Sequence, residues 1–185
     1  TDAPTKIKII GPATFKDDKL IGYLMEKDSI GYTIIRNQIE SMTISFPCDA
    51  KGNYGNVVID GLKNNLKVDL KKDKPLAKID VTGNAALVEY NCKTDLTKQK
   101  NINKIKDLVN EELKQIIEKT IITTQRNIKS DIFGFGERLY KDHNNYWKDN
   151  KKKWNETFST VPYEIKTNIK IERRGSTIDS TKGGV

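Results

Sequence analysis

The sequence predicts an α+β fold, in which a mainly antiparallel sheet of about four to five strands carries one long helix on one face and shorter helices follow it. Apolar and polar residues alternate over much of residues 38–92, and near residue 98 the apolar spacing changes to three and four. The chain has 185 residues, 36% of them hydrophobic, a length that suits one domain. We expect a single domain over 1–175 and a disordered polar tail over 176–185.

The N-terminal residues predict a hairpin followed by a short helix. Residues 6–10 are strand-like, Gly11-Pro12 interrupts them, and residues 13–15 resume the strand. Asp17-Asp18 lies in a turn, because aspartate side chains accept hydrogen bonds from the backbone two residues on. Residues 20–24 return as the second strand, and residues 26–29 open a helix that reaches Ile35.

Four further strands are predicted to form the sheet. They span residues 38–46, 56–70, 76–92 and 163–173. A break in the alternation at Gly61–Asn65 indicates a bulge or a bend. Short turns join the first three of these strands, which favours antiparallel pairing between them.

The long helix is predicted over residues 98–128, about 45 Å at 1.5 Å per residue. Its apolar residues are spaced to lie on one face, and Asp95 or Thr97 is placed to cap its start. The expected buried residues are Ile105, Leu108, Val109, Leu113, Ile116 and Ile117.

The segment Asp131–Glu137 combines three large apolar residues with two glycines between predicted helices. Residues 138–146 and 146–158 are predicted to be those following helices, and the second places Trp147, Trp154 and Phe158 on one face. Asp131 is placed to cap the helix or bond the turn, and Glu137 lies near a helix N-terminus. Two interpretations remain open: packing of the phenylalanines on the core, or a turn that presents one phenylalanine to a partner protein.

The net charge is +8, from 33 basic and 25 acidic residues. Residues 98–154 hold 14 basic and eight acidic groups, so most of the excess lies in the predicted helices. Lysine dominates, and we interpret it first as a solvated helix face. An acidic membrane surface, an acidic partner protein and a nucleic-acid-binding module are the alternatives; nucleic-acid binding would appear as a gel shift at low salt.

The residues that could carry chemistry form no recognised motif. Gly134-Phe135-Gly136 is too short for a dinucleotide fingerprint and follows a helix, and the sequence has neither a P-loop nor a nucleophile elbow. His143 is the only histidine, which excludes a histidine-based metal site. Cys48 and Cys92 both fall at predicted strand ends; a bridge is possible, but we expect two free, partly buried thiols. No stretch approaches the length of an apolar membrane span.

Three stretches in this order resemble the C-terminal domain of the C subunit of bacterial spore germinant receptors, the Ger(x)C lipoprotein family. They are Phe15-Lys16-Asp17-Asp18-Lys19-Leu20-Ile21-Gly22-Tyr23-Leu24, Asp131-Ile132-Phe133-Gly134-Phe135-Gly136-Glu137, and the Trp147…Trp154…Phe158 run that leads to a strand ending in Arg173-Arg174-Gly175. The likeness extends over about residues 10–175.

The resemblance implies the third domain of a lipid-anchored (palmitate-bearing) receptor subunit on the outer face of the spore inner membrane. The anchoring cysteine would lie far upstream, and neither Cys48 nor Cys92 has its context. It further implies a subunit that is not an enzyme and acts with a receptor A subunit and B subunit in nutrient-triggered germination. We expect no cofactor and no nucleic acid, and a monomer for the isolated domain.

No residue is assigned a catalytic, metal-binding or cofactor-binding role. The candidate partner contacts are Asp131, Phe133, Gly134, Phe135, Gly136, Glu137, Trp147 and Trp154.

Overall fold

A computed structural model describes residues 11–16 and 18–172 of the chain. Its elements are β1 (Ala13–Lys16), β2 (Lys19–Tyr23), α1 (Glu26–Ile35), β3 (Ser41–Pro47), β4 (Tyr54–Lys71), β5 (Lys74–Tyr90), α2 (Gln99–Thr123), α3 (Phe135–Asp142), α4 (Asn144–Asn150), α5 (Trp154–Phe158) and β6 (Tyr163–Glu172). The predicted α+β class is confirmed. The expected strand over residues 6–10 and the expected tail over 176–185 lie outside the described residues.

Four strands form one sheet in the order β3-β4-β5-β6. The pairs β3–β4 and β4–β5 are antiparallel, as the short turns predicted, whereas β6 runs parallel to β5. The pairing of β4 with β5 shifts between Asp60 and Lys63, and Gly61 there has a φ of +62°, so the predicted break is a bulge. Residues Lys72 and Asp73 close the β4–β5 hairpin with positive φ angles.

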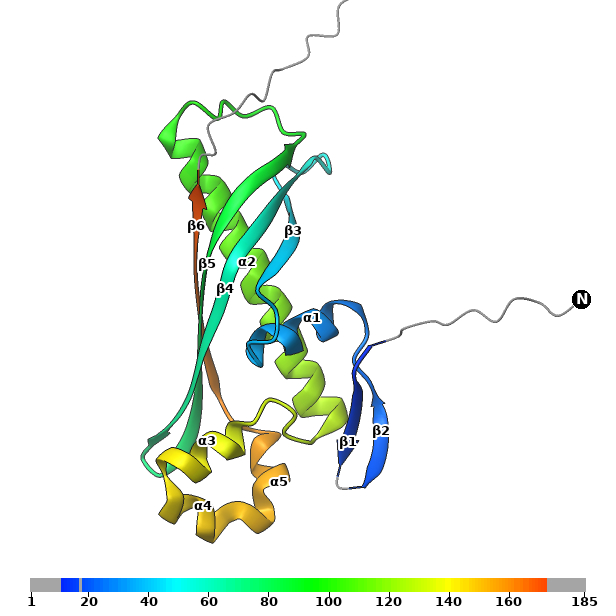
Figure 1. The fold of residues 1–185 in the computed structure, drawn as a ribbon, viewed down its shortest axis with the longest axis vertical. Helices are drawn as coiled ribbons and strands as arrows, with labels where there is room; N and C mark the ends of the chain where they lie inside the picture. The colour runs from blue at the N-terminus through cyan, green and yellow to red at the C-terminus, as the bar shows by residue number, and fades with distance from the viewer. Residues whose placement is uncertain (1–10, 17, 173–185) are drawn as a thin grey trace, which may run out of the picture.

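The helix α2 lies along one face of this sheet but does not reach the β4–β5 turn, and α1 packs against α2 (Figure 1). The residues that α2 buries include five of the six expected ones, while Leu108 is half-buried. Gly31 lets α1 approach closely, because a Cβ atom there would collide with the side chain of Thr120. The start of α2 differs from expectation: Asp95 accepts hydrogen bonds from Thr97 in the preceding turn and caps no helical N–H.

The predicted single helix over 98–128 changes form before its end. Regular α-helix stops at Thr123, and residues Thr124–Ile128 form one π-helical stretch that ends at Lys129 in the left-handed region. In this stretch the buried Gln125 donates hydrogen bonds from Nε2 to the carbonyl oxygens of Phe158 and Val161 at 2.9 and 2.8 Å. The end of the long helix is therefore tied to the residues that lead into β6.

Three short helices, α3, α4 and α5, gather beyond the end of α2, next to the β4–β5 turn (Figure 1). We call residues 131–161 the cap. Its boundaries differ from the predicted ones, since α3 begins at Phe135 rather than at 138 and the predicted helix over 146–158 is divided by a 3₁₀ turn at Lys151–Lys153. The cap closes the core at that end of the sheet with Phe133, Phe135, Leu139 and Phe158, all fully buried.

Cys48 and Cys92 form a disulfide, so the expectation of two free thiols is wrong. Cys48 directly follows β3 and Cys92 lies two residues beyond β5, and the register brings those two strand ends together with β4 between them. The Cα atoms are 6.3 Å apart, within the range that a disulfide spans. The bridge closes the end of the sheet opposite the cap.

Candidate functional site

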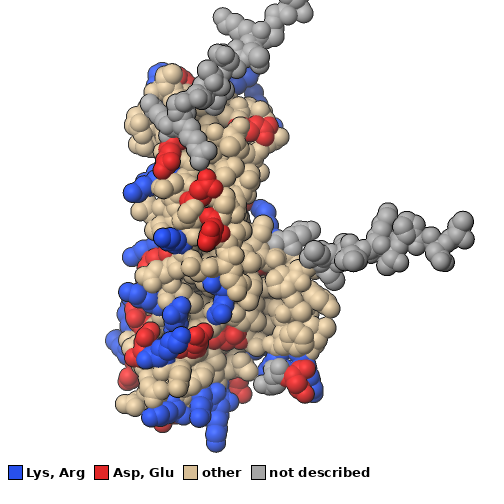
Figure 2. Space-filling model, in the orientation of Figure 1, with Lys and Arg blue, Asp and Glu red and all other residues tan. Residues whose placement is uncertain are grey.

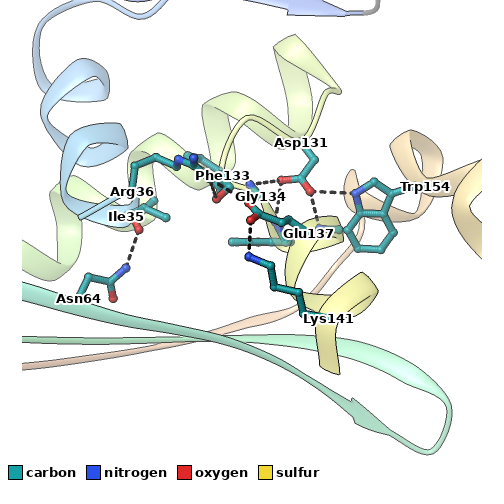
Figure 3. Close-up of polar contacts among 11 residues, drawn as sticks. Ile35, Arg36, Asn64, Asp131, Phe133, Gly134, Glu137, Lys141 and Trp154 are labelled. Carbon is teal, nitrogen blue, oxygen red and sulfur yellow. Dashed lines mark hydrogen bonds and ion pairs between the residues drawn. The ribbon is translucent and has the colours of Figure 1, made fainter. Parts of the chain in front are cut away.

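The carboxylate of Asp131 is the centre of the predicted site. Its Oδ1 accepts hydrogen bonds from the backbone N–H groups of Gly134 and Phe135, at 2.9 and 3.1 Å. Its Oδ2 accepts one from the backbone of Gly136 at 2.6 Å and one from the indole Nε1 of Trp154 at 2.9 Å (Figure 3). Three of these donors open α3, where N–H groups have no partner inside the helix. The predicted capping role of Asp131 is confirmed, and the carboxylate's bonding capacity is fully used.

Each glycine of the segment has its own structural reason. Gly134 has a φ of +83°, a conformation that glycine adopts at little cost, and it precedes α3 as the N-cap residue. Gly136 has an ordinary conformation, but a Cβ atom there would lie 2.6 Å from Nε1 of Trp154 and 2.8 Å from the ring of Trp147. Both tryptophans thus rest on the bare backbone of Gly136.

The phenylalanine rings of the segment form a buried cluster. The ring centroids of Phe133 and Phe135 are 5.5 Å apart, and those rings lie 6.1 and 5.7 Å from Phe158. Both phenylalanines of the segment have no exposed surface. The turn therefore presents neither ring to solvent, which agrees with the packing interpretation and contradicts the alternative in which it presents one phenylalanine to a partner.

The rings of Trp147 and Trp154 contact each other edge to face, 5.7 Å apart, although the single helix predicted to carry them is divided between α4 and α5. Phe158, the third residue predicted for that face, packs on Phe133 and Phe135 instead. Trp154 is buried, with 6% of its surface exposed, and Trp147 is half-buried. Burial of an indole is favourable only if its N–H finds an acceptor, and Asp131 supplies that acceptor. The contact therefore joins α5 to the turn before α3.

Arg36, the residue that directly follows α1, also contacts the Asp131–Glu137 segment. Arg36 donates from Nη1 to the carbonyl oxygen of Phe133 at 3.0 Å, and the same nitrogen lies 3.9 Å from Oε2 of Glu137 (Figure 3). Glu137 also pairs with Lys141 at 2.7 Å, one turn along α3. That hydrogen bond and the charge of Lys141 lower the pKa of Glu137, so the carboxylate is ionised at neutral pH.

The structure thus brings all eight predicted residues into one region, at the junction of α1, the end of α2 and the cap. Sequence reasoning missed Arg36, which reaches the segment across 97 positions, and Gln125, whose π-helical placement has no sequence signal. It also missed Tyr140, which is 55% exposed on α3. An apolar residue at a position that faces solvent is recognised only once the helix is placed.

The site is a joint between segments, in which Asp131, Trp154, Arg36 and Glu137 are each paired with another group of the chain. Elsewhere, Tyr163 donates to Glu118 at 3.4 Å, in a surface hollow of about 410 Å³ between α2 and β6. Burial first, and then the charge of Glu118, raise the pKa of Tyr163, so its phenol is a hydrogen-bond donor rather than a nucleophile.

Within residues 11–16 and 18–172, no group of three or more His, Cys, Asp or Glu side chains is placed to hold a metal ion.

Basic side chains concentrate toward the cap end of the molecule on the face that Figure 2 shows. The exposed lysines of this end lie in the β4–β5 turn and in the cap: Lys71, Lys72, Lys74, Lys141, Lys148, Lys151, Lys152 and Lys153. Asp73, Asp142 and Asp149 are exposed among them. In the described part of the chain, no helix is both long and apolar enough to cross a membrane.

The comparisons with known proteins identify the family. The family model described as "Spore germination B3/ GerAC like, C-terminal" matches residues 10–175. The chain belongs to this family. The match covers all three stretches on which the resemblance rested, the Asp131–Glu137 segment among them.

The fold of this GerAC-like domain also matches a solved structure, described as the crystal structure of the GerBC protein. The TM-score is 0.72 at 19% sequence identity, over 83% of this chain and 48% of that one. The chain thus spans about half the length of the crystallised protein that it matches. No curated protein matches the sequence. The family is one of spore germination proteins and not a known enzyme family.

Proposed function

We propose that this chain is the C-terminal domain of the C subunit of a spore germinant receptor, and that it acts through protein–protein contacts rather than catalysis. Its partners would be the receptor A and B subunits, which respond with it to nutrient germinants. The complete subunit would be held at the outer face of the spore inner membrane by a lipid anchor upstream of this chain. The single observation that carries the proposal is the family match over residues 10–175.

The region around Asp131–Glu137 is the proposed contact with another receptor subunit. Because Phe133 and Phe135 are buried, the contact would use the outward surface that they support: Glu137 and Tyr140 on α3 and the exposed part of Trp147. An exposed tyrosine and a half-exposed tryptophan beside a charged rim is the composition typical of interface centres. The buried joint would hold this surface in one geometry.

Spores that carry variants of this protein test the proposal. Inactivation of the gene should abolish or slow germination with the nutrient that this receptor senses. Glu137→Gln and Tyr140→Ser should impair germination and reduce co-purification of the A and B subunits. The melting temperature of the purified chain should stay unchanged in Tyr140→Ser, and in Glu137→Gln it should fall only by the small amount that an exposed ion pair contributes. Tyr54→Ser is the matched control, because Tyr54 is similarly exposed, at 44%, but lies at the opposite end of the sheet.

Two results would count against the proposal. Normal germination of the inactivated strain with every nutrient would remove the receptor function. If instead every variant that impairs germination also lowers the melting temperature, the segment acts only through folding, and the proposed contact is wrong.

A further inference from the structure

The hairpin β1–β2 carries an unusual concentration of exposed apolar side chains. Eight large hydrophobic residues are exposed among the described residues, and five of them lie between positions 15 and 25. These are Phe15 at 53% exposure, Leu20 at 50%, Ile21 at 39%, Tyr23 at 48% and Met25 at 48%. The other three are scattered over β4, β5 and α3.

The register of the hairpin places Phe15, Leu20 and Tyr23 on its outer face, while Ile21 lies at a register shift between Gly22 and Leu20 and Met25 follows β2. Phe15 pairs with Leu20 and Ala13 pairs with Tyr23, and directly paired residues project to the same side of a two-stranded sheet. Thr14 projects to the other side and is buried, with 3% exposure. We call Phe15, Leu20, Ile21, Tyr23 and Met25 the hairpin face.

The body of the domain supports only the inner side of the hairpin. Ser130 donates to the carbonyl oxygen of Phe15 at 3.2 Å, and Leu24 is buried as the chain enters α1. In Figure 1 the hairpin stands beside the end of α2, separate from the four-stranded sheet. An isolated two-stranded hairpin is marginally stable in water, so an apolar outer face is costly unless something covers it.

The charges beside the hairpin face argue against a membrane as the cover. Lys16, Asp18 and Lys19 at the turn are exposed and of mixed sign. A segment that inserts into an anionic bilayer surface combines apolar side chains with a basic rim. The exposed lysines that would suit such a surface lie instead in the β4–β5 turn and the cap.

The length of the matching GerBC structure indicates that another part of the same protein covers the hairpin face. The crystallised GerBC chain is about twice as long as the part that this chain matches, and the matching family model is described as C-terminal. A preceding part of the protein would enter the described fold at Gly11, two residues before β1. Tethering at that point gives the preceding part a high effective concentration at the hairpin.

We propose that the hairpin face is the docking surface for the part of the complete subunit that precedes this chain. Phe15, Tyr23 and Met25 would be its central contacts, because aromatic residues and methionine are enriched in the buried centres of interfaces. This inference rests on family membership and on the hairpin geometry. It does not depend on the proposed contact near Glu137.

Hydroxyl-radical footprinting of the complete gene product and of the 185-residue chain tests the proposal. In the complete protein, labelling of Phe15, Tyr23 and Met25 should fall about fivefold, since side chains at the centre of an interface lose most of their exposed surface. Tyr54 and Tyr140 are internal controls of similar exposure and should be labelled equally in both proteins. Equal labelling of the hairpin face in both proteins would overturn the proposal.

A substitution separates the remaining explanations. In the complete protein, Leu20→Glu should restore labelling of Tyr23 and make the link before residue 11 more sensitive to protease, whereas Tyr140→Glu should do neither. Protection that rises with the concentration of the isolated chain would mean that a second copy covers the face. Protection of the complete protein that needs added receptor subunits or lipid vesicles would assign the face to those partners. Either outcome would refute docking within the subunit.

Discussion

The replacement of Asp131 by asparagine is the sharpest test of the joint, because it keeps the shape of the side chain and changes only its chemistry. The carboxylate accepts four hydrogen bonds, two on each oxygen. An asparagine has one acceptor oxygen and one NH₂ group. In either orientation of the amide, the NH₂ group would therefore face two donors, either Gly134 and Phe135 or Gly136 and Trp154.

The cost follows from these two unpaired donors. Each buried donor left without an acceptor costs about 1–3 kcal/mol. Asp131 is half-buried, so water relieves part of the loss, and we expect the free energy of unfolding to fall by about 2–4 kcal/mol. That is a large share of the roughly 5–15 kcal/mol by which a native domain is stable.

Urea denaturation followed by circular dichroism measures the change, with an unchanged m-value as the sign that only stability has moved. Asp149→Asn is the control, because Asp149 is exposed on α4, and it should shift stability by no more than about 0.5 kcal/mol. Trp154→Phe removes one of the facing donors, so its effect and that of Asp131→Asn should fall short of additive by about 1 kcal/mol. A change of less than about 0.5 kcal/mol for Asp131→Asn would refute the reasoning.

Four further predictions concern the joint and the disulfide. Truncation by Trp154→Ala should lower stability by about 3–5 kcal/mol in denaturant titration, and a loss below about 1 kcal/mol would mean that the ring lies at the surface. Gly136→Ala should cost about 1–3 kcal/mol because its methyl group collides with both tryptophans, whereas Gly22→Ala, with open space around it, should be neutral in the same titration. Reduction of the Cys48–Cys92 bridge, which spans 44 positions, should cost about 4 kcal/mol; equal melting temperatures with and without reductant would contradict the pairing. The pKa of Glu137 should lie below its ordinary 4.5 in an NMR titration and rise in Lys141→Met; its contribution to stability is present above the unfolded pKa and is lost as pH falls through the folded pKa.

The sheet and the long helix were predictable because each buries one face. Alternation places Ile44 and Phe46 of β3, and Val57 and Ile59 of β4, on the buried side, and a slip of one residue would expose them all. The change of period near residue 98 marked α2 in the same way. Regular burial leaves a regular pattern, and that pattern is local in the sequence.

The remaining features depend on partners that are distant in the sequence. Nothing in residues 163–172 says that β6 pairs with β5 in parallel, and Arg36 meets the carbonyl of Phe133 across 97 positions. The disulfide was missed for the same reason, since strand ends 44 positions apart become neighbours only through the register of β4. In the Asp131–Glu137 segment, the sequence left open whether the phenylalanines pack on the core or one is exposed, and the structure buries both.

The parallel strand explains why the recognisable motifs lie where they do. After β5 the chain must return to the far end of the sheet before β6 can run parallel to it, and α2 makes that return (Figure 1). The turn out of α2 and the turn into β6 then expose backbone groups at the end of the core, where they need partners. Gln125 satisfies the carbonyls of Phe158 and Val161, and Asp131 satisfies the N–H groups that open α3. Asp131, one of the residues on which the resemblance rested, is therefore a joint of the crossover, and a functional effect of changing it has meaning only beside a measurement of stability.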